Sequence, residues 1–461
     1  MTAPDQAFPQ RPELPSEMFF RLADRFSLHV SPNYGLLVGE DCAGLAWLSK
    51  ETWQILAQCD GTQTMGEILA RRANAHDRAT DVEICKAIMA VADLAAERWL
   101  VLDTRPARRQ LRITGDPAIA YPTALQVELT MACNLRCSYC YRSAQSEDHP
   151  DAITTDALLT ILQQLRDYGL LSVELTGGEP LLHRDFMEVL NFCAEHFALV
   201  AVLTNGVLVT PDLLDRMLPF REKMIFSVSL DSHVEETHDR RRGKQGAFAR
   251  TTRALRMLAE RQFRTRVSMT ADEDTWDDIE PTLLLAKSLG ATSFAYSPVL
   301  PLGRAARDFR FWKRDAKEIL DDEIRLKDEY KDFLHLLPED ALLELHNPGG
   351  CGAGYRGYAM DPIGRIRPCV TFDENVAVYG SLTTHSPHEV FAGDLAAAFA
   401  AVTPPQPDVC GTCKYAFFCQ NCPLRGLMGC QWIGRDHCAW LKQPATARWD
   451  HLVRQHSLPS Q

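Results

Sequence analysis

The clearest pattern of apolar and polar positions runs from residue 123 to about residue 305. Short apolar segments, of the length of β-strands, alternate there with longer segments whose apolar residues recur at helical spacing. Such strand–helix units predict a parallel sheet with right-handed crossovers, in which ligands gather at the carboxyl ends of the strands. The predicted strands are 125–129, 172–176, 199–203, 224–230, 264–269 and 292–297, and the helices between them include 155–168, 185–195, 211–217, 248–261 and 279–289.

A second pattern, over residues 17–104, predicts a small separate domain. Two short apolar strands, 26–30 and 34–38, are joined by a Ser-Pro-Asn sequence that is typical of a β-hairpin turn. Three helices and a final strand follow, which together give a winged-helix-like α+β outline. We expect the helices at 49–58, 65–74 and 81–97, with Ser49 and Thr64 as caps of the first two, a turn at 59–62 and the strand at 99–102.

The remaining segments have weaker patterns. Residues 1–16 are polar and rich in proline and predict a disordered tail, and residues 105–122 predict a linker. Residues 306–345 are highly charged and predict a helical bridge. Residues 346–445 are rich in Gly, Pro and Cys, with so little apolar periodicity that we expect bound metal to stabilise them in place of an ordinary core. The last residues, 446–461, are expected to form a C-terminal tail.

The composition narrows the class of protein. A chain of 461 residues, 46% of them apolar, has room for about three domains with large cores. The net charge of −12 argues against binding to nucleic acid or to an anionic membrane. We find no signal segment and no apolar run of about 18 residues, so we expect a cytoplasmic protein without a membrane partner. In that compartment, clustered cysteines are more often metal ligands than disulfides, and isolated ones are small buried hydrophobes. The isolated cysteines are Cys42, Cys59, Cys85 and Cys193.

Three cysteines, Cys133, Cys137 and Cys140, follow directly after the first predicted strand of the parallel sheet. An iron–sulfur cluster usually takes four thiolates, so three of them leave one iron open for a substrate or cofactor. This Cys-x3-Cys-x2-Cys loop resembles the signature of radical S-adenosylmethionine (radical SAM) enzymes. The resemblance implies an α/β fold with a partial (β/α)6 TIM barrel over 123–305. It also implies a 4Fe–4S cluster on the three cysteines and S-adenosyl-L-methionine (SAM) as cofactor.

The ends of the other predicted strands have the residues that such a cofactor needs. Glycines let a backbone approach a ligand closely, and the carboxylate of Glu179 would accept hydrogen bonds from an ammonium group. The sequence Gly177-Gly178-Glu179-Pro180 resembles the motif that holds the amino group of SAM in this family. By the same resemblance, further SAM contacts are assigned to Asn205, Ser229, Asp231, Ser297 and the aromatic Tyr139. No catalytic side chain beyond the cluster is assigned.

The second group of cysteines, from 351 to 438, resembles the SPASM extension, which holds two auxiliary iron–sulfur clusters. The resemblance assigns Cys410, Cys413, Cys419 and Cys438 to the distal cluster, and Cys351, Cys369 and Cys422 to the cluster nearer the barrel. The chain departs from the family pattern in its last spacing, which is two residues, and in the extra Cys430. Three alternatives follow. Cys430 completes the proximal cluster, or it takes the place assigned to Cys422, or the proximal cluster has an open iron able to hold substrate. Eight thiols favour two fully ligated clusters, and two zinc sites are the alternative.

Residues 17–104 also resemble a known domain. The sequence around Asp60-Gly61, with Leu48 and Trp53 before it, is similar to the peptide chaperone of pyrroloquinoline-quinone biosynthesis. That chaperone is the type member of domains that bind the leader peptides of ribosomally made natural products. A strand edge beside a helix would capture such a peptide by strand addition. A winged helix that contacts DNA is the alternative, although the third helix is acidic and has few basic residues to meet phosphates.

Together these resemblances predict an oxidative peptide maturase. A precursor peptide would be bound through its leader, and a 5′-deoxyadenosyl radical would abstract a hydrogen from one of its residues. Oxidation of the product radical would leave a thioether or carbon–carbon crosslink, with flavodoxin or ferredoxin as the electron donor. Two alternatives remain open: a sulfatase-type formylglycine maturase, and a redox-sensing regulator that binds DNA.

Overall fold

The computed structural model describes residues 16–39, 45–74, 81–307, 313–314, 316–334, 352–373, 375–411 and 413–456. Two compact units, residues 1–119 and residues 120–461, are considered separately. Cys42, predicted to be a buried thiol, and Cys351, predicted to be a cluster ligand, lie outside the described residues. Among the described residues, no helix combines the length and the apolar character needed to cross a bilayer.

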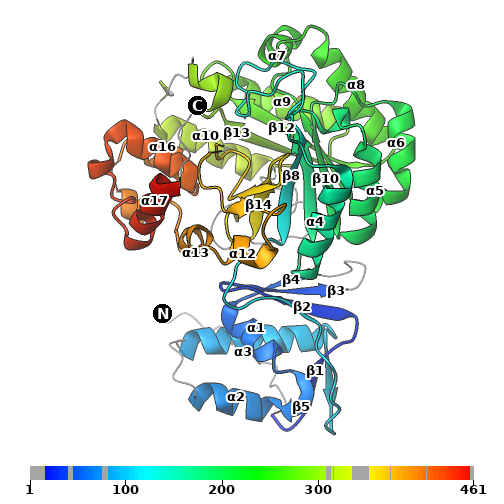
Figure 1. Ribbon diagram of the computed structural model, residues 1–461, viewed down its shortest axis with the longest axis vertical. Helices are drawn as coiled ribbons and strands as arrows, with labels where there is room; N and C mark the ends of the chain where they lie inside the picture. The colour runs from blue at the N-terminus through cyan, green and yellow to red at the C-terminus, as the bar shows by residue number, and fades with distance from the viewer. Residues whose placement is uncertain are drawn as a thin grey trace, which may run out of the picture. The chain divides into compact units, whose positions relative to one another are not determined.

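The described residues of the first unit form two sheets and three helices (Figure 1). One sheet is antiparallel, with the strand order β5-β1-β6. The other has the order β4-β3-β2-β7, in which only β7 runs parallel to its neighbour. The strands are β1 (Phe19–Leu22), β2 (Phe26–Val30), β3 (Gly35–Gly39), β4 (Leu45–Leu48), β5 (Asp60–Thr64), β6 (Leu100–Asp103) and β7 (Ile113–Gly115), and the helices are α1 (Lys50–Leu56), α2 (Met65–Asn74) and α3 (Asp81–Ala96).

Local sequence explains where two of these helices begin. Ser49 Oγ accepts a hydrogen bond from Thr52 N at 3.2 Å and caps α1, as the sequence predicts. Thr64 and Glu67 form a reciprocal capping pair at α2. Glu67 accepts from Thr64 N at 2.8 Å, and Thr64 Oγ1 accepts from Glu67 N at 3.3 Å. Both predicted caps are therefore confirmed.

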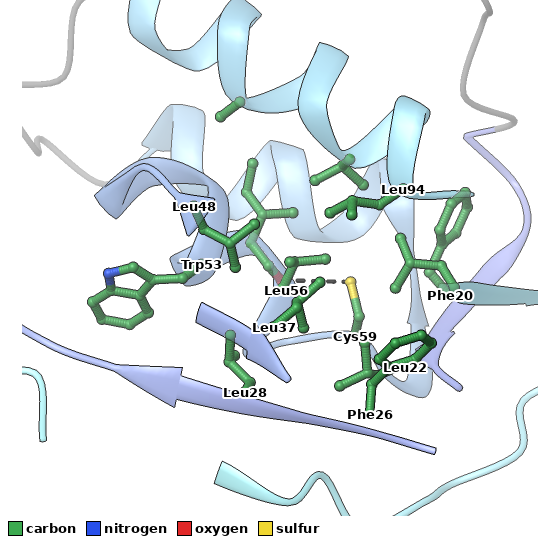
Figure 2. Close-up of a cluster of buried hydrophobic side chains, with 14 of the residues drawn as sticks. Phe20, Leu22, Phe26, Leu28, Leu37, Leu48, Trp53, Leu56, Cys59 and Leu94 are labelled. Carbon is green, nitrogen blue, oxygen red and sulfur yellow. Dashed lines mark hydrogen bonds between the residues drawn. The ribbon is translucent and has the colours of Figure 1, made fainter. Parts of the chain in front are cut away.

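The core of the first unit consists of apolar side chains from the hairpin and from helices α1 and α3 (Figure 2). Leu28 and Leu37 contribute from the two hairpin strands, Leu56 from α1 and Leu94 from α3. Cys59 lies among them with 0% exposure and donates its S–H to Ile55 O at 3.5 Å. Burial raises its pKa to about 12, so the thiol stays neutral and packs as a small apolar group, as predicted.

Four strands of this unit are not predicted by the sequence pattern: β1, β4, β5 and β7. Strands β1, β4 and β7 have only three or four residues, too few for an alternating pattern to be distinguished from a loop. Strand β7 lies in the segment predicted as a linker, and residues 105–119 belong to the first unit. Residues 59–62 are predicted as a turn, but residues 60–62 belong to strand β5 (Asp60–Thr64), so this prediction is wrong. A Cβ on Gly61, which has φ of +81°, would lie only 2.3 Å from Ala107 O, so this close return of the chain requires glycine.

The second unit is built on a nine-stranded sheet with the order β13-β12-β11-β10-β9-β8-β14-β15-β16. Strands β8 to β13 are parallel and adjacent in chain order, which confirms the predicted large parallel sheet. Strand β14 adds in parallel beside β8, and β15 and β16 follow in antiparallel pairing. The bounds are β8 (Ala124–Thr130), β9 (Ser172–Gly177), β10 (Leu199–Thr204), β11 (Met224–Ser229), β12 (Arg264–Ala271), β13 (Ser293–Pro298), β14 (Gly357–Met360), β15 (Arg365–Arg367) and β16 (Gly380–Ser381).

Amphipathic helices cover the parallel strands, with α4, α5, α6 and α8 along one side of the sheet (Figure 1). Helix α4 is capped by Thr154 and buries a stripe that includes Leu158, Ile161 and Leu165. Cys193 of α5 is 0% exposed, as predicted for an isolated cysteine. The helices are α4 (Thr155–Asp167), α5 (Phe186–His196), α6 (Pro211–Met217), α7 (Glu235–Arg242), α8 (Ala247–Glu260), α9 (Ile279–Ser288) and α10 (Ala316–Glu329).

The C-terminal part of this unit has an apolar core, which the sequence pattern does not predict. Phe372, Phe399, Trp440 and Trp449 pack together, and Trp449 is 0% exposed. Aromatic side chains each bury a large area, so a few of them form a core even in a segment without apolar periodicity. Helix α17, which carries Trp449, includes residues predicted as a tail. The helices here are α12 (Pro387–Phe391), α13 (Asp394–Ala400), α14 (Pro407–Cys410), α15 (Ala416–Cys419), α16 (Pro423–Ile433) and α17 (Pro444–His456).

Candidate active site

The three clustered cysteines lie on a loop that follows β8, at the carboxyl end of the parallel strands. We call residues 131–145, which include them, the cysteine loop. Burial, with smaller contributions from nearby Glu179 and the other two thiols, raises the pKa of Cys133 to about 11. Without metal, this thiol is protonated, so iron would take the place of its proton. The three cysteines pack together in one apolar group with Leu135, Val207 and Ala247. This grouping fits three ligands of a single iron–sulfur cluster.

The end of helix α7 contacts the cysteine loop. Arg136 N donates to Arg242 O at 3.1 Å, and Ser138 N donates to Arg241 O at 3.0 Å. Carbonyls in the last turn of a helix lack partners within the helix, so they are available to the loop. Gly243 follows with φ of +66°, and a Cβ there would lie 2.5 Å from Arg136 O. The close contact between helix and loop therefore depends on this glycine.

The segment after β13 contacts the cysteine loop through other groups. Arg304 donates from Nε to Cys137 O and from Nη1 to Ala144 O, each at 2.8 Å, and from its backbone N to Cys140 O at 3.0 Å. A guanidinium has several donors, so one side chain bridges two carbonyls of the loop. Gly303 has φ of +53°, and a Cβ on it would lie 2.4 Å from Cys140 O. Two segments far along the chain thus fix the backbone around the cysteines.

The last residue of strand β9, Gly177, and Gly178 after it lie against the start of the cysteine loop. Gly178 N donates to Thr130 O at 2.7 Å, and Glu179 N donates to Ala132 O at 2.8 Å. A Cβ on Gly178 would lie 2.1 Å from Ala132 O, far inside van der Waals contact. No other residue would let the two backbones lie at this distance. The structure thus places the predicted SAM motif directly beside the predicted cluster loop.

The carboxylate of Glu179 is buried at this strand end with 1% exposure. It accepts hydrogen bonds from Thr204 Oγ1 at 2.7 Å, from Asn205 N at 2.8 Å and from Leu181 N at 3.3 Å. Burial nevertheless raises its pKa to about 7. Asn205 also links to the cysteine loop, because its Nδ2 donates to Asn134 Oδ1 at 2.8 Å. Glu179 is therefore a buried carboxylate whose charge depends on pH near neutrality.

Three more residues predicted to contact SAM lie at strand ends of the same sheet. Pro180 is buried and lies three residues after the end of β9, Ser229 ends β11 and is half-buried, and Ser297 is exposed on β13. Strand β13 is at the edge of the sheet, two places from β11. All three thus belong to the carboxyl edge, where ligands of parallel sheets bind.

Tyr139 and Asp231, also predicted to contact SAM, contact each other. The hydroxyl of Tyr139 donates to Asp231 Oδ2, and Arg242 Nε lies 2.8 Å from the same oxygen. The other oxygen of Asp231 accepts from Thr270 N at 3.2 Å. Both carboxylate oxygens therefore already have protein partners, and the side chain has 0% exposure.

A buried ion-pair network next to the cysteine loop is not predicted by our sequence analysis. Glu128 of β8 is 1% exposed; Arg142 Nε lies 2.7 Å from its Oε1, and Arg367 of β15 contacts its Oε2. Burial raises the pKa of Glu128, and the two guanidinium groups counteract that shift. Arg367 also donates to Phe372 O, near Cys369. The sequence does contain one sign of this network, because Glu128 is an acidic residue inside an apolar strand. A buried carboxylate in such a place requires a cationic partner.

Five cysteines of the second group line one small cavity: Cys410, Cys413, Cys419, Cys430 and Cys438. Helix α16 approaches it through Gly429, where a Cβ would lie 2.3 Å from Cys419 Sγ. Cys430 donates a hydrogen bond to Cys438 and thereby lowers the pKa of Cys438. Of these two thiols, Cys438 is therefore the one that ionises more readily.

The remaining two described cysteines of this group, Cys369 and Cys422, do not line that cavity. Cys369 follows β15, with its Sγ 2.8 Å from Thr371 Oγ1, and Cys422 precedes α16. The structure thus groups Cys430 with the cysteines predicted for the distal cluster. Among the described residues, no three His, Cys, Asp or Glu side chains converge on a site for one metal ion. Cubane thiolates bind separate irons, so a cluster requires no such convergence.

A cavity of about 520 Å³ opens between the cysteine loop and residues 370–373. Tyr141, adjacent to Cys140, lines it from the loop, and Thr371 lines it from the segment that begins after Cys369. This volume is within the usual range of small-molecule sites. The cavity thus lies between two of the predicted redox sites.

Comparison with known proteins gives consistent results. Residues 127–286 match the model of the radical SAM superfamily. The chain is 29% identical over 404 residues to the antilisterial bacteriocin subtilosin biosynthesis protein AlbA of Bacillus subtilis, covering 86% of this chain and 88% of AlbA. It is 26% identical over 309 residues to the sporulation killing factor maturation protein SkfB of the same organism, covering 66% and 75%.

Solved structures show the same fold. The structure of Streptococcus suis SuiB bound to its precursor peptide SuiA superimposes with a TM-score of 0.59 and 15% identity, over 89% of this chain and 97% of SuiB. The chain thus has a radical SAM domain on a large parallel sheet, with homology to AlbA and SkfB, and it is an enzyme.

Proposed function

We propose that this protein is a radical SAM enzyme that modifies a ribosomally synthesised precursor peptide by forming an oxidative crosslink. The observation that carries the proposal is the meeting of the cysteine loop and the Gly177–Pro180 segment at one edge of the sheet. The printed names of AlbA, SkfB and SuiB, which refer to a bacteriocin, a killing factor and a precursor peptide, support a peptide substrate.

The first cofactor site consists of Cys133, Cys137 and Cys140, which would hold a 4Fe–4S cluster with one open iron. With SAM bound there, the cluster would supply a 5′-deoxyadenosyl radical that abstracts a hydrogen atom from the peptide. Glu179 would accept hydrogen bonds from the SAM amino group, and the two glycines before it would give the cofactor close access to the backbone. Asn205, Ser229, Ser297 and Tyr139 would contribute the other contacts.

We further propose that the C-terminal cysteines hold two auxiliary clusters. The cavity lined by five thiols supports a distal cluster on four of them: Cys410, Cys413, Cys419 and Cys438. Cys369 and Cys422, with Cys351, would hold the proximal one, and Cys430 would stay a hydrogen-bond donor to Cys438. After hydrogen abstraction, the product radical would lose one electron to these clusters and one proton to a base, leaving a thioether or carbon–carbon bond. Reduced flavodoxin or ferredoxin, in the cytosol, would supply the first electron.

The first unit is proposed to bind the leader of the peptide. Its three helices and small sheets are consistent with a winged-helix-like recognition domain, and β4 and β6 are edge strands in the described part of the chain. An extended leader would add to such an edge through main-chain hydrogen bonds, and pockets for alternate side chains would give specificity.

The direct test is anaerobic incubation of the reconstituted protein with SAM, dithionite and candidate peptides encoded beside its gene. We expect 5′-deoxyadenosine and a peptide that has lost two hydrogen atoms, with the new bond located by fragmentation. A peptide without its leader should bind weakly and react slowly, and a Cys137→Ala variant should give neither product. Deoxyadenosine formation without any change in peptide mass would contradict the proposal.

The two alternatives are less consistent with these observations. A formylglycine maturase leaves the first unit without a role. A DNA-binding regulator leaves unexplained why glycines and a buried carboxylate lie beside the cysteine loop. Binding of the protein to a defined operator at low salt would favour the regulator.

A further inference from the structure

A buried arginine points at one sulfur of the cysteine loop. Arg242, the last residue of α7, is 7% exposed, and its Nη1 lies 3.8 Å from Cys137 Sγ, within reach of an N–H···S contact. Its Nε lies 2.8 Å from Asp231 Oδ2, and Asp231 has 0% exposure. The guanidinium therefore forms a bridge between one carboxylate and one predicted cluster ligand.

The backbone fixes this arrangement. Arg136 N and Ser138 N, on either side of Cys137, donate to the carbonyls of Arg242 and Arg241. Those two bonds hold the Cys137 sulfur and the end of α7 at a set separation. The Tyr139 hydroxyl donates to Asp231, and the Arg242 guanidinium lies 5.6 Å from the Tyr139 ring centre. The side chain therefore has little freedom to turn away from the sulfur.

The other charged groups near this pair have partners of their own. Arg241 donates to the carboxylate of Asp272 and to Thr270 O. Asp239 accepts hydrogen bonds from the backbone of the segment after α7. His238 Nδ1 accepts from Asp231 N at 3.2 Å, and burial lowers its pKa to about 4, so it is neutral at ordinary pH. Arg242 is thus the cation that faces the sulfur, and Asp231 is its counter-ion.

We propose that Arg242 is a positioning residue that raises the reduction potential of the cluster held by the cysteine loop, and that Asp231 limits this effect. Reduction adds negative charge to the cluster and its thiolates. A nearby N–H donor and a buried positive charge stabilise that reduced form, whereas the carboxylate partly cancels the charge. The inference rests on the cluster that the proposed function requires, but not on the peptide substrate.

Substitutions of Arg242 and Asp231 should shift the reduction potential in opposite directions. A purely structural role of the two residues would not give opposite shifts. The potential of the reconstituted full chain is measured by redox titration followed by electron paramagnetic resonance, using the signal that a Cys133→Ala variant lacks. Arg242→Gln should shift this potential to more negative values, and Asp231→Asn to more positive values. Arg240→Gln, on the exposed side of the same helix, is the matched control and should leave it unchanged.

The outcomes are distinguishable from failure of the proposed function. A wild-type chain that takes up no cluster on the loop would overturn the proposed function itself. If the wild-type chain does hold the cluster, the role of Arg242 alone would be overturned by two results. One is a shift of the potential in the same direction in both variants, and the other is no shift in either variant. If Arg242→Gln loses its iron, the potentials of Asp231→Asn and Arg242→Lys test the proposal instead. We expect a higher potential than wild type in Asp231→Asn and a slightly lower one in Arg242→Lys. A potential at or below wild type in Asp231→Asn would contradict the proposal.

Discussion

Arg142 Nε lies 2.7 Å from Glu128 Oε1, while Arg367 contacts the other oxygen of the same buried carboxylate. One residue of β8 thus connects the cysteine loop to a strand that lies 239 residues further along the chain. Removing the carboxylate would leave two buried guanidinium groups without their counter-charge. Such a loss typically costs about 3–5 kcal/mol, because desolvated charge is no longer compensated.

We therefore expect Glu128→Ala to lower the free energy of unfolding of the second unit by about 3–5 kcal/mol. Urea unfolding of cluster-free protein, followed by fluorescence of the buried Trp440 and Trp449, measures this change. Glu222→Ala is a suitable control, since the Glu222 side chain is 84% exposed and its loss should change stability by less than about 0.5 kcal/mol. Equal stability of the two variants would show that the network is not a stabilising element.

Gly178→Ala should weaken SAM binding at least about tenfold, equivalent to ~1.4 kcal/mol. Its new Cβ would lie 2.1 Å from Ala132 O, so the strand end and the cysteine loop must move apart. Gly357→Ala is the matched control, because its nearest neighbour would be 3.8 Å away. Calorimetric titration with SAM measures both. Unchanged affinity in Gly178→Ala would show that SAM does not depend on this contact.

The raised pKa of Glu179, about 7, predicts a pH dependence of SAM binding. The carboxylate must be ionised to accept an ammonium group well, so affinity should rise as the pH increases from about 6 to 8. The cofactor-free protein should behave in the opposite way. Its Glu179 holds a proton more tightly than the unfolded chain does, so this contribution to stability is present at low pH and is lost as the pH rises through about 7. Both trends should disappear in Glu179→Gln; a wild-type affinity that does not vary with pH would exclude this role.

The five thiols around one cavity predict unequal effects of cysteine substitution. Cys413→Ala should remove about one 4Fe–4S cluster from the reconstituted protein, whereas Cys430→Ala should keep the full iron content. Iron and sulfide analysis of variants reconstituted in parallel measures this difference. A matching loss of iron from Cys430→Ala would assign Cys430 as a ligand.

Sequence reasoning predicted the elements whose signal is local. The cysteine triplet and the glycines of β9 are contiguous, and the period of α4 extends over several turns, so each is readable in one short window. The roles of Arg242 and Arg304 were missed. Arg242 ends a run of three arginines followed by glycine, which resembles a solvated helix end, and Arg304 lies in a short segment without apolar periodicity. Their partners, Cys137 and its neighbours, are more than 100 residues away. The aromatic core around Trp449 was missed for a related reason, since its members come from separate irregular segments.

The contacts that hold the cysteine loop also set an order of events during biosynthesis. Residues 241–243 and 303–304, which bind the loop, leave the ribosome long after the cysteines do. Until they arrive, the three thiols are on an unsupported segment, open to oxidation and to the wrong metal. We therefore expect productive loading with iron and sulfide after β13 and the segment that follows it have joined the sheet. We therefore expect the cluster to be added late, to a nearly finished domain.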